Sequence, residues 1–488
     1  MIVKRFYEEK LAQASYLLGC AAAGEAVVVD PNRDIEQYVA AAEREGVRIT
    51  AVAETHIHAD FVSGVRELAA RTGATKYLSG EGGADWAYAY AGEGRTVLLK
   101  DGDAFRVGNI RIEALHTPGH TPEHLTFLVT DGAVADQPIA ALTGDFVFVG
   151  DVGRPDLLEK AAGVAGTMEP GARRLFRSLQ AFKRRPDWLQ IWPGHGAGSA
   201  CGKGLSAIPH STVGYERLYN WAFRIEDEDE FVRAVLTGQP EPPKYFARMK
   251  RVNREGPALV NGIRRPERLP AERLEAVIAA GALVIDTREA ADFAAGHVPG
   301  TINIPLGRSF STWAGWLLPA DREFYLIVDA AAGAHGMEEA ARDLAMIGLD
   351  AIGGYFTYDA VDAWAAAGRA LETVPQLTVE ELAARSGEFA VLDVRGRAEW
   401  DAARLPETVA GGRLVNVPLG YLPDRLDEVP TDRPVVVHCQ AGARSAIAAS
   451  VLRANGFDNV MNLVGGFAAW EAAGLPVVRE GGEGRAGA

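Results

Sequence analysis

The sequence predicts an α/β protein of three domains, and three observations lead to this fold class. The 488 residues, at about 150 per domain, are enough for three sizeable cores. Short apolar runs that read as strands alternate with helical patterns, and Pro-rich stretches near residues 257–270 and 375 interrupt the chain. We therefore expect these parts: a domain at 1–256, a domain at 257–373, a domain at 374–480 and a flexible tail at 481–488.

Composition excludes several classes of protein. Only three cysteines occur, Cys20, Cys201 and Cys439, which excludes a disulfide framework or a Cys-rich zinc module and indicates a reducing compartment. A net charge of −15 argues against nucleic acid or an anionic membrane as the main partner. No uncharged run reaches the length of a membrane span, and no leader segment is recognised, so we expect a cytoplasmic protein.

The two C-terminal domains repeat each other. Residues 283–286 resemble 391–393, and residues 326–329 resemble 435–438. Each of the latter strands precedes a short Gly-containing loop and a helical pattern, which predicts parallel α/β sandwiches of about 110 residues. Thr378 and Glu381 have capping-box spacing and predict a helix start at this point.

The N-terminal domain places histidine and aspartate where short apolar strands end. Residues 49–54 precede His56, residues 139–142 precede Asp145, and residues 189–192 precede His195. Loops at strand ends are where a scaffold presents ligands. The candidate metal ligands of this domain are His56, His58, Asp60, His116, His120, Asp145 and His195.

Imidazole with carboxylate suits zinc or non-haem iron, and two histidines with one aspartate leave open positions for oxygen or substrate. The order THxHxD, PGHT, TGD, PGHG resembles the metallo-β-lactamase superfamily, which implies an αββα sandwich over 1–256. Binuclear zinc hydrolases of that superfamily have a histidine where this chain has Phe61, which cannot bind a metal. We therefore expect one metal; the alternative is that Phe61 simply packs while Asp60 and His195 hold a second metal weakly.

The domain also resembles the persulfide dioxygenase family. That resemblance implies one Fe(II) per chain, with zinc as the alternative, bound by His56, His120 and Asp145. It implies that the remaining polar residues orient the ligands or form a second metal site, namely His58, Asp60 and His195.

Two further features accompany this centre. The simplest interpretation of Arg154 and Asp156 is an ion pair that stabilises a loop; the alternative is a contact with the substrate. Cys201 lies in a Gly-rich loop near His195, where it is either a small buried residue or a second reactive thiol.

The third domain carries a single cysteine in a tight loop directly after a buried strand. Backbone N–H groups, the following helix N-terminus and Arg444 all favour a thiolate and bind anionic adducts. Cysteine phosphatases space Cys and Arg by five residues and this loop by four, so sulfur transfer is favoured over phosphoryl chemistry. The segment resembles the rhodanese active loop, which implies a persulfide on Cys439 in a cradle of Gln440, Ala441, Gly442, Ala443, Arg444 and Ser445.

The middle repeat has Ala330 where Cys439 stands, so we expect it to lack the nucleophile and to serve in spacing, docking or gating. The whole chain resembles bacterial fusions of persulfide dioxygenase with an inactive and an active rhodanese domain. This implies sulfide detoxification by a homo-oligomeric enzyme: O2 oxidises a low-molecular-weight persulfide to sulfite, and Cys439 then converts the sulfite to thiosulfate. Linking both centres in one chain raises the effective concentration of the intermediate.

Two other functions remain open. One is a glyoxalase-II-like zinc thioester hydrolase fused to a sulfurtransferase. The other is a non-enzymatic sulfur carrier in which only Cys439 matters. The sequence does not distinguish among carrier thiols such as glutathione, bacillithiol and coenzyme A.

Overall fold

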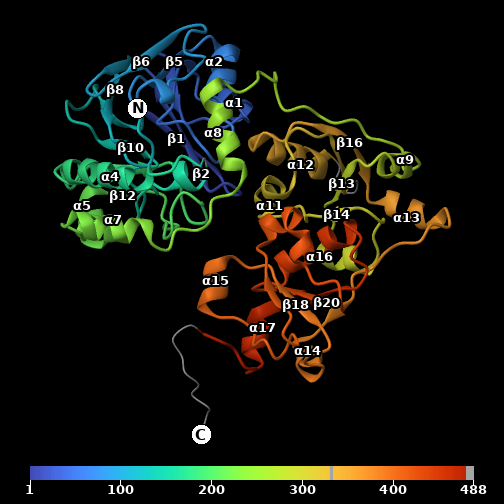
Figure 1. Ribbon diagram of the computed structural model, residues 1–488. Helices are drawn as coiled ribbons and strands as arrows, with labels where there is room; N and C mark the ends of the chain where they lie inside the picture. Colours follow the sequence, from blue (N-terminus) through green and yellow to red (C-terminus); the bar gives the residue numbers. More distant parts are fainter. Residues whose placement is uncertain (162, 330–333, 480–488) are drawn as a thin grey trace. The chain divides into compact units, whose positions relative to one another are not determined.

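The computed structural model describes residues 1–161, 163–329 and 334–479 (Figure 1). The chain divides into two compact units, Met1–Arg264 with Leu344–Gly348, and Arg265–Asp343 with the chain from Leu349 onward. Ala330, expected in place of the nucleophile, and the tail expected at 481–488 lie outside the described residues. The three-domain boundaries remain a prediction.

The first unit contains two six-stranded sheets. The first sheet has the order β1-β2-β3-β4-β5-β6, antiparallel from β1 to β3 and parallel from β3 to β6. Its strands are β1 (Ile2–Glu8), β2 (Gln13–Cys20), β3 (Glu25–Val29), β4 (Arg48–Ala53), β5 (Thr75–Ser79) and β6 (Thr96–Leu99).

The second sheet has the order β12-β11-β10-β9-β8-β7 and is antiparallel except between β10 and β11. Its strands are β7 (Ala104–Val107), β8 (Ile110–His116), β9 (Leu125–Asp131), β10 (Ala140–Gly144), β11 (Gln190–Pro193) and β12 (Ser211–Thr212).

Side chains that alternate along the strands bury both faces of each sheet. Tyr16 and Leu18 of β2 join a core shared with Phe127 and Leu142 of the second sheet, whereas Leu17 between them packs on the opposite face. Period-two alternation sends successive side chains to opposite faces, so the two sheets pack face to face. The outer face of the first sheet is covered by α1 (Glu36–Arg44), α2 (Val65–Thr72) and η1 (Ala84–Trp86).

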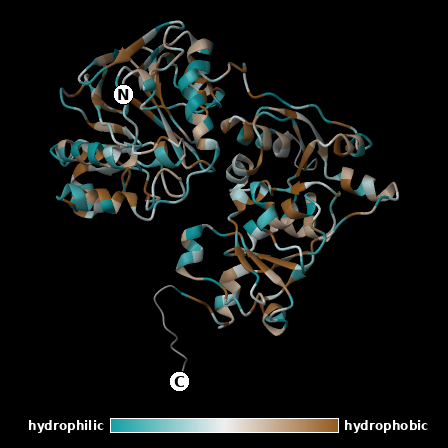
Figure 2. Cartoon of the chain, in the orientation of Figure 1, coloured by the Kyte–Doolittle hydropathy of each residue, from teal (hydrophilic) through white to brown (hydrophobic). Residues whose placement is uncertain are grey.

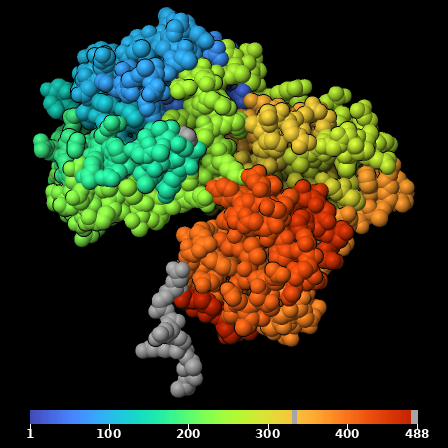
Figure 3. All heavy atoms as spheres, viewed as in Figure 1, coloured from blue at the N-terminus to red at the C-terminus, as the bar shows by residue number. Residues whose placement is uncertain are grey.

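The outer face of the second sheet packs against helices that follow it in the chain. Residues of α4 to α7 share a core with this sheet, and the green part of the chain that contains these helices lies at the surface of the unit (Figure 3). The helices of this part are α3 (Leu157–Lys160), α4 (Met168–Phe182), α5 (Val213–Tyr219), α6 (Trp221–Arg224), α7 (Glu228–Leu236) and α8 (Tyr245–Glu255). The layers confirm the predicted αββα sandwich.

The second unit contains two sheets in which all the strand pairs are parallel, as predicted. The first has the order β14-β13-β15-β16, with β13 (Leu283–Asp286), β14 (Ile302–Asn303), β15 (Phe324–Val328) and β16 (Ile352–Thr357). The second has the order β17-β21-β20-β18-β19, with β17 (Gln376–Leu377), β18 (Ala390–Asp393), β19 (Leu414–Asn416), β20 (Val435–His438) and β21 (Val460–Leu463).

Helices alternate with these strands, which are among the most hydrophobic segments of the unit (Figure 2). Those around the four-stranded sheet are α9 (Arg273–Ala279), α10 (Ala290–Ala295), α11 (Phe310–Leu317), α12 (Ala334–Met346) and α13 (Asp359–Ala366). Those around the five-stranded sheet are α14 (Val379–Ala384), α15 (Arg397–Ala402), η2 (Leu419–Asp424), η3 (Leu426–Glu428), α16 (Ala443–Ala454) and α17 (Gly466–Ala472).

The predicted capping box is confirmed. The Glu381 N–H donates to Thr378 Oγ1 at 3.2 Å, and the Thr378 N–H donates to the Glu381 carboxylate at 2.8 Å, at the start of α14. Among the described residues, no helix combines the length and apolar character that crossing a membrane requires.

Candidate metal centre and thiol loop

Three of the predicted ligands meet at the edge of the two N-terminal sheets. His56 follows β4, His120 lies in the loop between β8 and β9, and Asp145 follows β10. Their ligand atoms all lie within 4.8 Å of one another, and all three side chains are buried. The structure therefore brings together a group of two histidines and one carboxylate.

Hydrogen bonds on the far side of each ring direct the Nε2 atoms toward this group. His120 Nδ1 donates to the Arg154 carbonyl oxygen at 2.9 Å. Thr55 donates its hydroxyl proton to Asp30, so it accepts a hydrogen bond from His56 Nδ1 at 3.0 Å. With Nδ1 engaged, Nε2 is the atom that is free to bind a metal.

Asp145 depends on a glycine that precedes it. Gly144 has φ +47°, and a Cβ there would lie 2.5 Å from Thr55 Oγ1 and 2.8 Å from His124 Nε2. The Asp145 N–H donates to that same His124 nitrogen at 3.1 Å. A side chain at Gly144 would thus disturb the backbone that presents Asp145. His124 was not among the residues predicted from the sequence.

The charge states of these residues suit a metal. Burial lowers the pKa of His56 and of His120, which favours neutral imidazole. Burial opposes ionisation of Asp145, but His195 and His120 beside it hold the pKa of Asp145 below its ordinary value. Neither carboxylate oxygen of Asp145 has a well-formed hydrogen bond from the described part of the chain, although the Cys201 thiol and the Nε2 atoms of His120 and His195 lie beside it. A buried carboxylate flanked by imidazoles fits a metal site, because a bound cation would balance its charge.

A second group lies next to the first. Asp60, His195 and Cys201 also bring one ligand atom each within 4.8 Å of the others. His195 Nε2 is 3.2 Å from Asp60 Oδ2 and 3.4 Å from Asp145 Oδ1, so it bridges both groups. Burial raises the pKa of Cys201 well above its ordinary value, and the Asp145 and Asp60 carboxylates add to this. Burial and these carboxylates therefore disfavour the thiolate form of Cys201 when no metal is bound.

His58 belongs to neither group. Its Nε2 atom lies 3.3 Å from Asp30 Oδ1. Burial opposes protonation, but the Asp30 and Glu54 carboxylates raise the pKa of His58 to about 9. The Phe61 ring packs on His58 with ring centroids 4.4 Å apart, and Phe61 is fully buried. The structure thus separates His58 from Asp60 and His195, with which the sequence analysis had grouped it.

An ion pair and a set of side-chain hydrogen bonds stabilise the loops that carry the candidate ligands. Arg154 is fully buried and donates to both Asp156 carboxylate oxygens at 2.7 and 2.8 Å, which confirms the predicted ion pair. Asn253 of α8 donates to the carbonyl oxygens of His58 at 2.8 Å and Phe61 at 2.7 Å. Asn253 could not be identified from the sequence, because it lies almost 200 residues from the loop that it fixes and belongs to no local motif.

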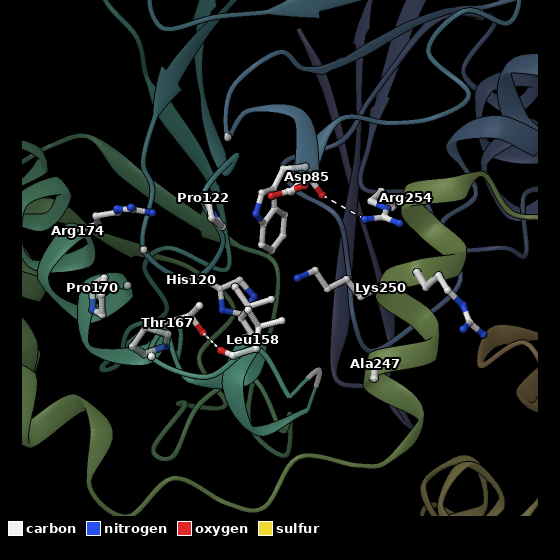
Figure 4. A pocket seen from close by; sticks show the side chains of 18 residues that line it. Asp85, His120, Pro122, Leu158, Thr167, Pro170, Arg174, Ala247, Lys250 and Arg254 are labelled. Atoms are coloured by element: carbon white, nitrogen blue, oxygen red, sulfur yellow. Dashed lines mark hydrogen bonds between the residues drawn. The ribbon is translucent and has the colours of Figure 1, made fainter.

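A cavity of about 680 Å³ opens beside the metal centre, with His120 in its wall (Figure 4). Its lining comes from η1 and its flanks, the His120 loop, α3, α4 and α8. In the close view His120 and Lys250 point into the cavity from opposite sides. The cavity therefore gives a ligand direct access to one of the metal-binding histidines.

The thiol loop lies between β20 and α16. Cys439 is buried directly after β20, and Gly442, with φ +100°, leads into α16 at Ala443. The Gly442 N–H donates to Cys439 Sγ at 3.1 Å. The N–H groups of the first helical turn have no partner inside the helix, so they are available to an anion on the sulfur. Gln440, Ala441 and Ser445 complete this loop and first turn.

Arg444 does not stand free beside the thiol. Its two Nη atoms donate to the Glu399 carboxylate of α15 at 2.6 and 2.7 Å. Burial opposes ionisation of Glu399, but Arg444 lowers the pKa of this carboxyl group. Glu399 was not identified from the sequence, and its charge partly offsets that of Arg444.

Family models match both parts of the chain. The metallo-beta-lactamase superfamily model matches residues 10–195, and the rhodanese-like domain model matches residues 270–357 and 378–473.

Individual relatives match each part separately or extend over both. The mitochondrial persulfide dioxygenase of Bos taurus is 29% identical over 239 residues, which covers 48% of this chain and 80% of the relative. A sulfurtransferase of Allochromatium vinosum is 38% identical over 88 residues, which covers 18% and 77% respectively. A crystal structure of a metallo-beta-lactamase from Staphylococcus aureus subsp. aureus COL has 43% identity and a TM-score of 0.65, covering 73% of this chain and 99% of that one.

Proposed function

The chain belongs to the metallo-beta-lactamase superfamily and carries two rhodanese-like domains, and on this premise we propose that it is an iron-dependent persulfide dioxygenase coupled to a sulfurtransferase. Its relatives include a persulfide dioxygenase and a sulfurtransferase, which is the same pair of activities.

The ligand set is the observation that carries the first half of the proposal. His56, His120 and Asp145 converge as two imidazoles and one carboxylate, the donor set of non-haem iron oxygenases. Phe61 contributes no ligand and packs on His58 instead. When bound, iron supplies the redox chemistry that allows O2 to react with sulfur.

The protein's own residues bind and orient the reactants. The cavity beside His120 admits the persulfide, and the surrounding buried side chains limit access of bulk water. In the balanced reaction the terminal sulfur of the persulfide receives both atoms of O2 and one oxygen from water. Its bond to the carrier sulfur breaks, so that sulfite and the carrier thiol leave.

Cys439 performs the second half. Its thiolate attacks the terminal sulfur of a second persulfide, and the carrier thiol leaves as the cysteine persulfide forms. Sulfite then attacks the outer sulfur of this persulfide, which releases thiosulfate and returns the thiolate. The loop N–H groups and Arg444 stabilise the anionic sulfur throughout.

Metal content measured together with oxygen uptake tests the first half. We expect about one iron per chain and O2 consumption that depends on added persulfide. Two zinc ions per chain without oxygen uptake would contradict the proposal.

A glyoxalase-II-like thioester hydrolase is the second candidate, because Asp60, His195 and Cys201 form an adjacent group that could hold a second metal. Hydrolysis of S-lactoylglutathione by zinc-loaded protein, in the absence of oxygen uptake by iron-loaded protein, would favour this candidate.

A further inference from the structure

Lysine and arginine side chains line the cavity beside His120, and Lys250 of α8 differs from the others. Arg174 and Arg251 are exposed, and Arg254 donates to a backbone carbonyl oxygen at 3.4 Å. Lys250 is only partly exposed, and its ammonium group has no hydrogen bond or ion pair within the described part of the chain. The N–H donors of Lys250 are therefore available to a ligand in the cavity.

An aromatic ring fixes the position of this ammonium group. Lys250 Nζ lies 3.5 Å from the centroid of the Trp86 ring, which is a cation–π contact. Gly82 has φ +83°, and a Cβ at this position would lie 2.9 Å from Trp86 Cβ and 2.8 Å from Glu123 Cβ. Glycine is therefore required where Trp86 and Glu123 approach each other.

Glu123 connects this wall of the cavity to the loop that carries a metal ligand. Its Oε1 atom accepts a hydrogen bond from the Ile57 N–H at 2.8 Å, directly after His56. Its Oε2 atom has no well-formed hydrogen bond from the described residues, although Thr121 lies beside it and Lys250 acts on it electrostatically. The group behind Lys250 therefore has a fixed position with respect to the metal centre.

The direction of the side chain places the ammonium group opposite the metal centre. In the close view Lys250 projects into the cavity toward the side on which His120 lies (Figure 4). In the proposed function the terminal sulfur of the persulfide lies at the metal centre. The carrier sulfur is one bond away from it, at the end of the cavity that Lys250 faces.

We infer that Lys250 is a catalytic residue, which donates a proton to the carrier sulfur as the S–S bond of the persulfide breaks. This inference rests on the proposed persulfide oxidation. In that reaction a persulfide anion, O2 and one water give the carrier thiol and hydrogen sulfite. The terminal sulfur is oxidised and O2 is reduced, while the electron pair of the S–S bond goes to the carrier sulfur. The proton that Lys250 gives to this sulfur is returned to the amine from the water that is consumed.

The acidity of Lys250 suits this task. Burial lowers the pKa of Lys250 to about 8, although the Glu123 carboxylate opposes the shift. Alkyl thiols have a pKa of about 8.5, so the proton transfer is nearly balanced. The arginines of the cavity stay protonated at any such pH and therefore cannot act as the acid.

Persulfides with different leaving groups test the inference. Lys250→Arg keeps the charge but cannot release the proton, so we expect kcat of oxygen uptake to fall by about 100-fold with glutathione persulfide. With trifluoroethyl persulfide, whose thiol is more acidic and leaves without help, the fall should be less than about tenfold. KM should change little, and an unchanged iron content would show that the variant folds. Lys100→Arg, at an exposed lysine outside the cavity lining, is the matched control and should change neither rate.

A pH series provides a second readout. With glutathione persulfide, kcat/KM should fall as the pH rises through about 8, because Lys250 then loses its proton. This fall should be absent in Lys250→Arg. The charged and titratable groups around Lys250 are Glu123, Asp85, His120, Arg174, Arg251 and Arg254.

Chemical labelling provides a readout that does not depend on turnover. Limited reductive methylation with formaldehyde and cyanoborohydride modifies free amines, and peptide mass spectrometry measures the rate at each lysine. S-methylglutathione, an unreactive thioether, at about ten times its measured Kd should slow the modification of Lys250 by about tenfold. The rate at Lys100 should not change.

The outcomes separate this inference from the proposed function. An equal loss of kcat with both persulfides, a change confined to KM, or labelling of Lys250 that the bound thioether does not slow overturns the role of Lys250. If the unaltered protein still takes up oxygen in these cases, the proposed function stands. Absence of oxygen uptake by the unaltered protein with either persulfide overturns the proposed function and this inference with it.

Discussion

In the proposed function, the metal centre and the thiol loop both stabilise a reactive sulfur anion, but they do so with different groups. At the metal centre, side chains from three separate loops converge, and neither oxygen of Asp145 has a well-formed hydrogen bond from the described residues. At the thiol loop, consecutive residues do the work, and the Gly442 N–H already donates to Cys439 Sγ.

The two regions differ in the source of the positive charge that balances an anion. The metal centre holds a buried carboxylate among neutral imidazoles, so a cation from outside would balance the carboxylate charge. The thiol loop has its own positive end, made of backbone dipoles and the Arg444 guanidinium, whose charge Glu399 partly offsets. We therefore expect the first region to fail when its ligands are altered and the second to tolerate metal removal.

Replacing the nucleophile should have the largest effect on one region alone. Cys439→Ser should abolish sulfur transfer, because a hydroxyl group cannot carry the sulfane sulfur. Oxygen uptake should persist, and the product measured by ion chromatography should shift from thiosulfate to sulfite. An unchanged thiosulfate yield would refute the coupling of the two regions.

Removing a metal ligand is the reciprocal experiment. His120→Ala should lower iron content and decrease oxygen uptake by more than about 100-fold, since even partners behind the ligands contribute 10–100-fold. Sulfur transfer from thiosulfate to cyanide should remain near the level of the unaltered protein. The unaltered protein should also retain its sulfur transfer activity after a chelator has removed the metal. Loss of sulfur transfer in either case would show that the regions are not independent.

A substitution at Gly144, which precedes Asp145, should have a smaller effect on stability and iron binding. Gly144→Ala should lower the free energy of unfolding by about 1–3 kcal/mol and weaken iron binding, because the residue is left-handed and a Cβ meets Thr55 and His124. Gly150 has φ +81°, but a Cβ at this position would meet no atom within 4 Å, so Gly150→Ala is the matched control. It should cost less stability and leave iron content unchanged. Denaturant unfolding and metal analysis provide the readouts.

The smallest effect is expected at Glu399. Glu399→Gln should leave the Arg444 charge less compensated and increase the alkylation rate of Cys439 at neutral pH by about two- to fivefold, because a nearby cation favours the thiolate. Oxygen uptake should not change. A decreased alkylation rate would indicate that Glu399 mainly holds Arg444 in place rather than offsetting its charge.

The sequence predicted the elements well because their signals are local. The strand at 435–438 coincides with β20, and the capping box of Thr378 and Glu381 begins α14. Short motifs that resemble the metallo-β-lactamase superfamily predicted the αββα layers, and the two observed sheets confirm these layers. Partners distant in the chain had no such signal. Asn253, His124 and Glu399 each act on a functional residue through a contact that folding alone creates.

The sequence by itself determined which residue types could react: a lone cysteine in a Gly-containing loop, and histidines and aspartates at strand ends. Tertiary structure decided how they are grouped. It brings His56, His120 and Asp145 together as the family resemblance implied, but it places Cys201 with Asp60 and His195, and His58 beside Asp30. The physical reason is that ligand geometry depends on how strands from two sheets end at one edge. The loop motifs in the sequence indicate which side chains lie at this edge. The packing of the two sheets determines the distances between those side chains.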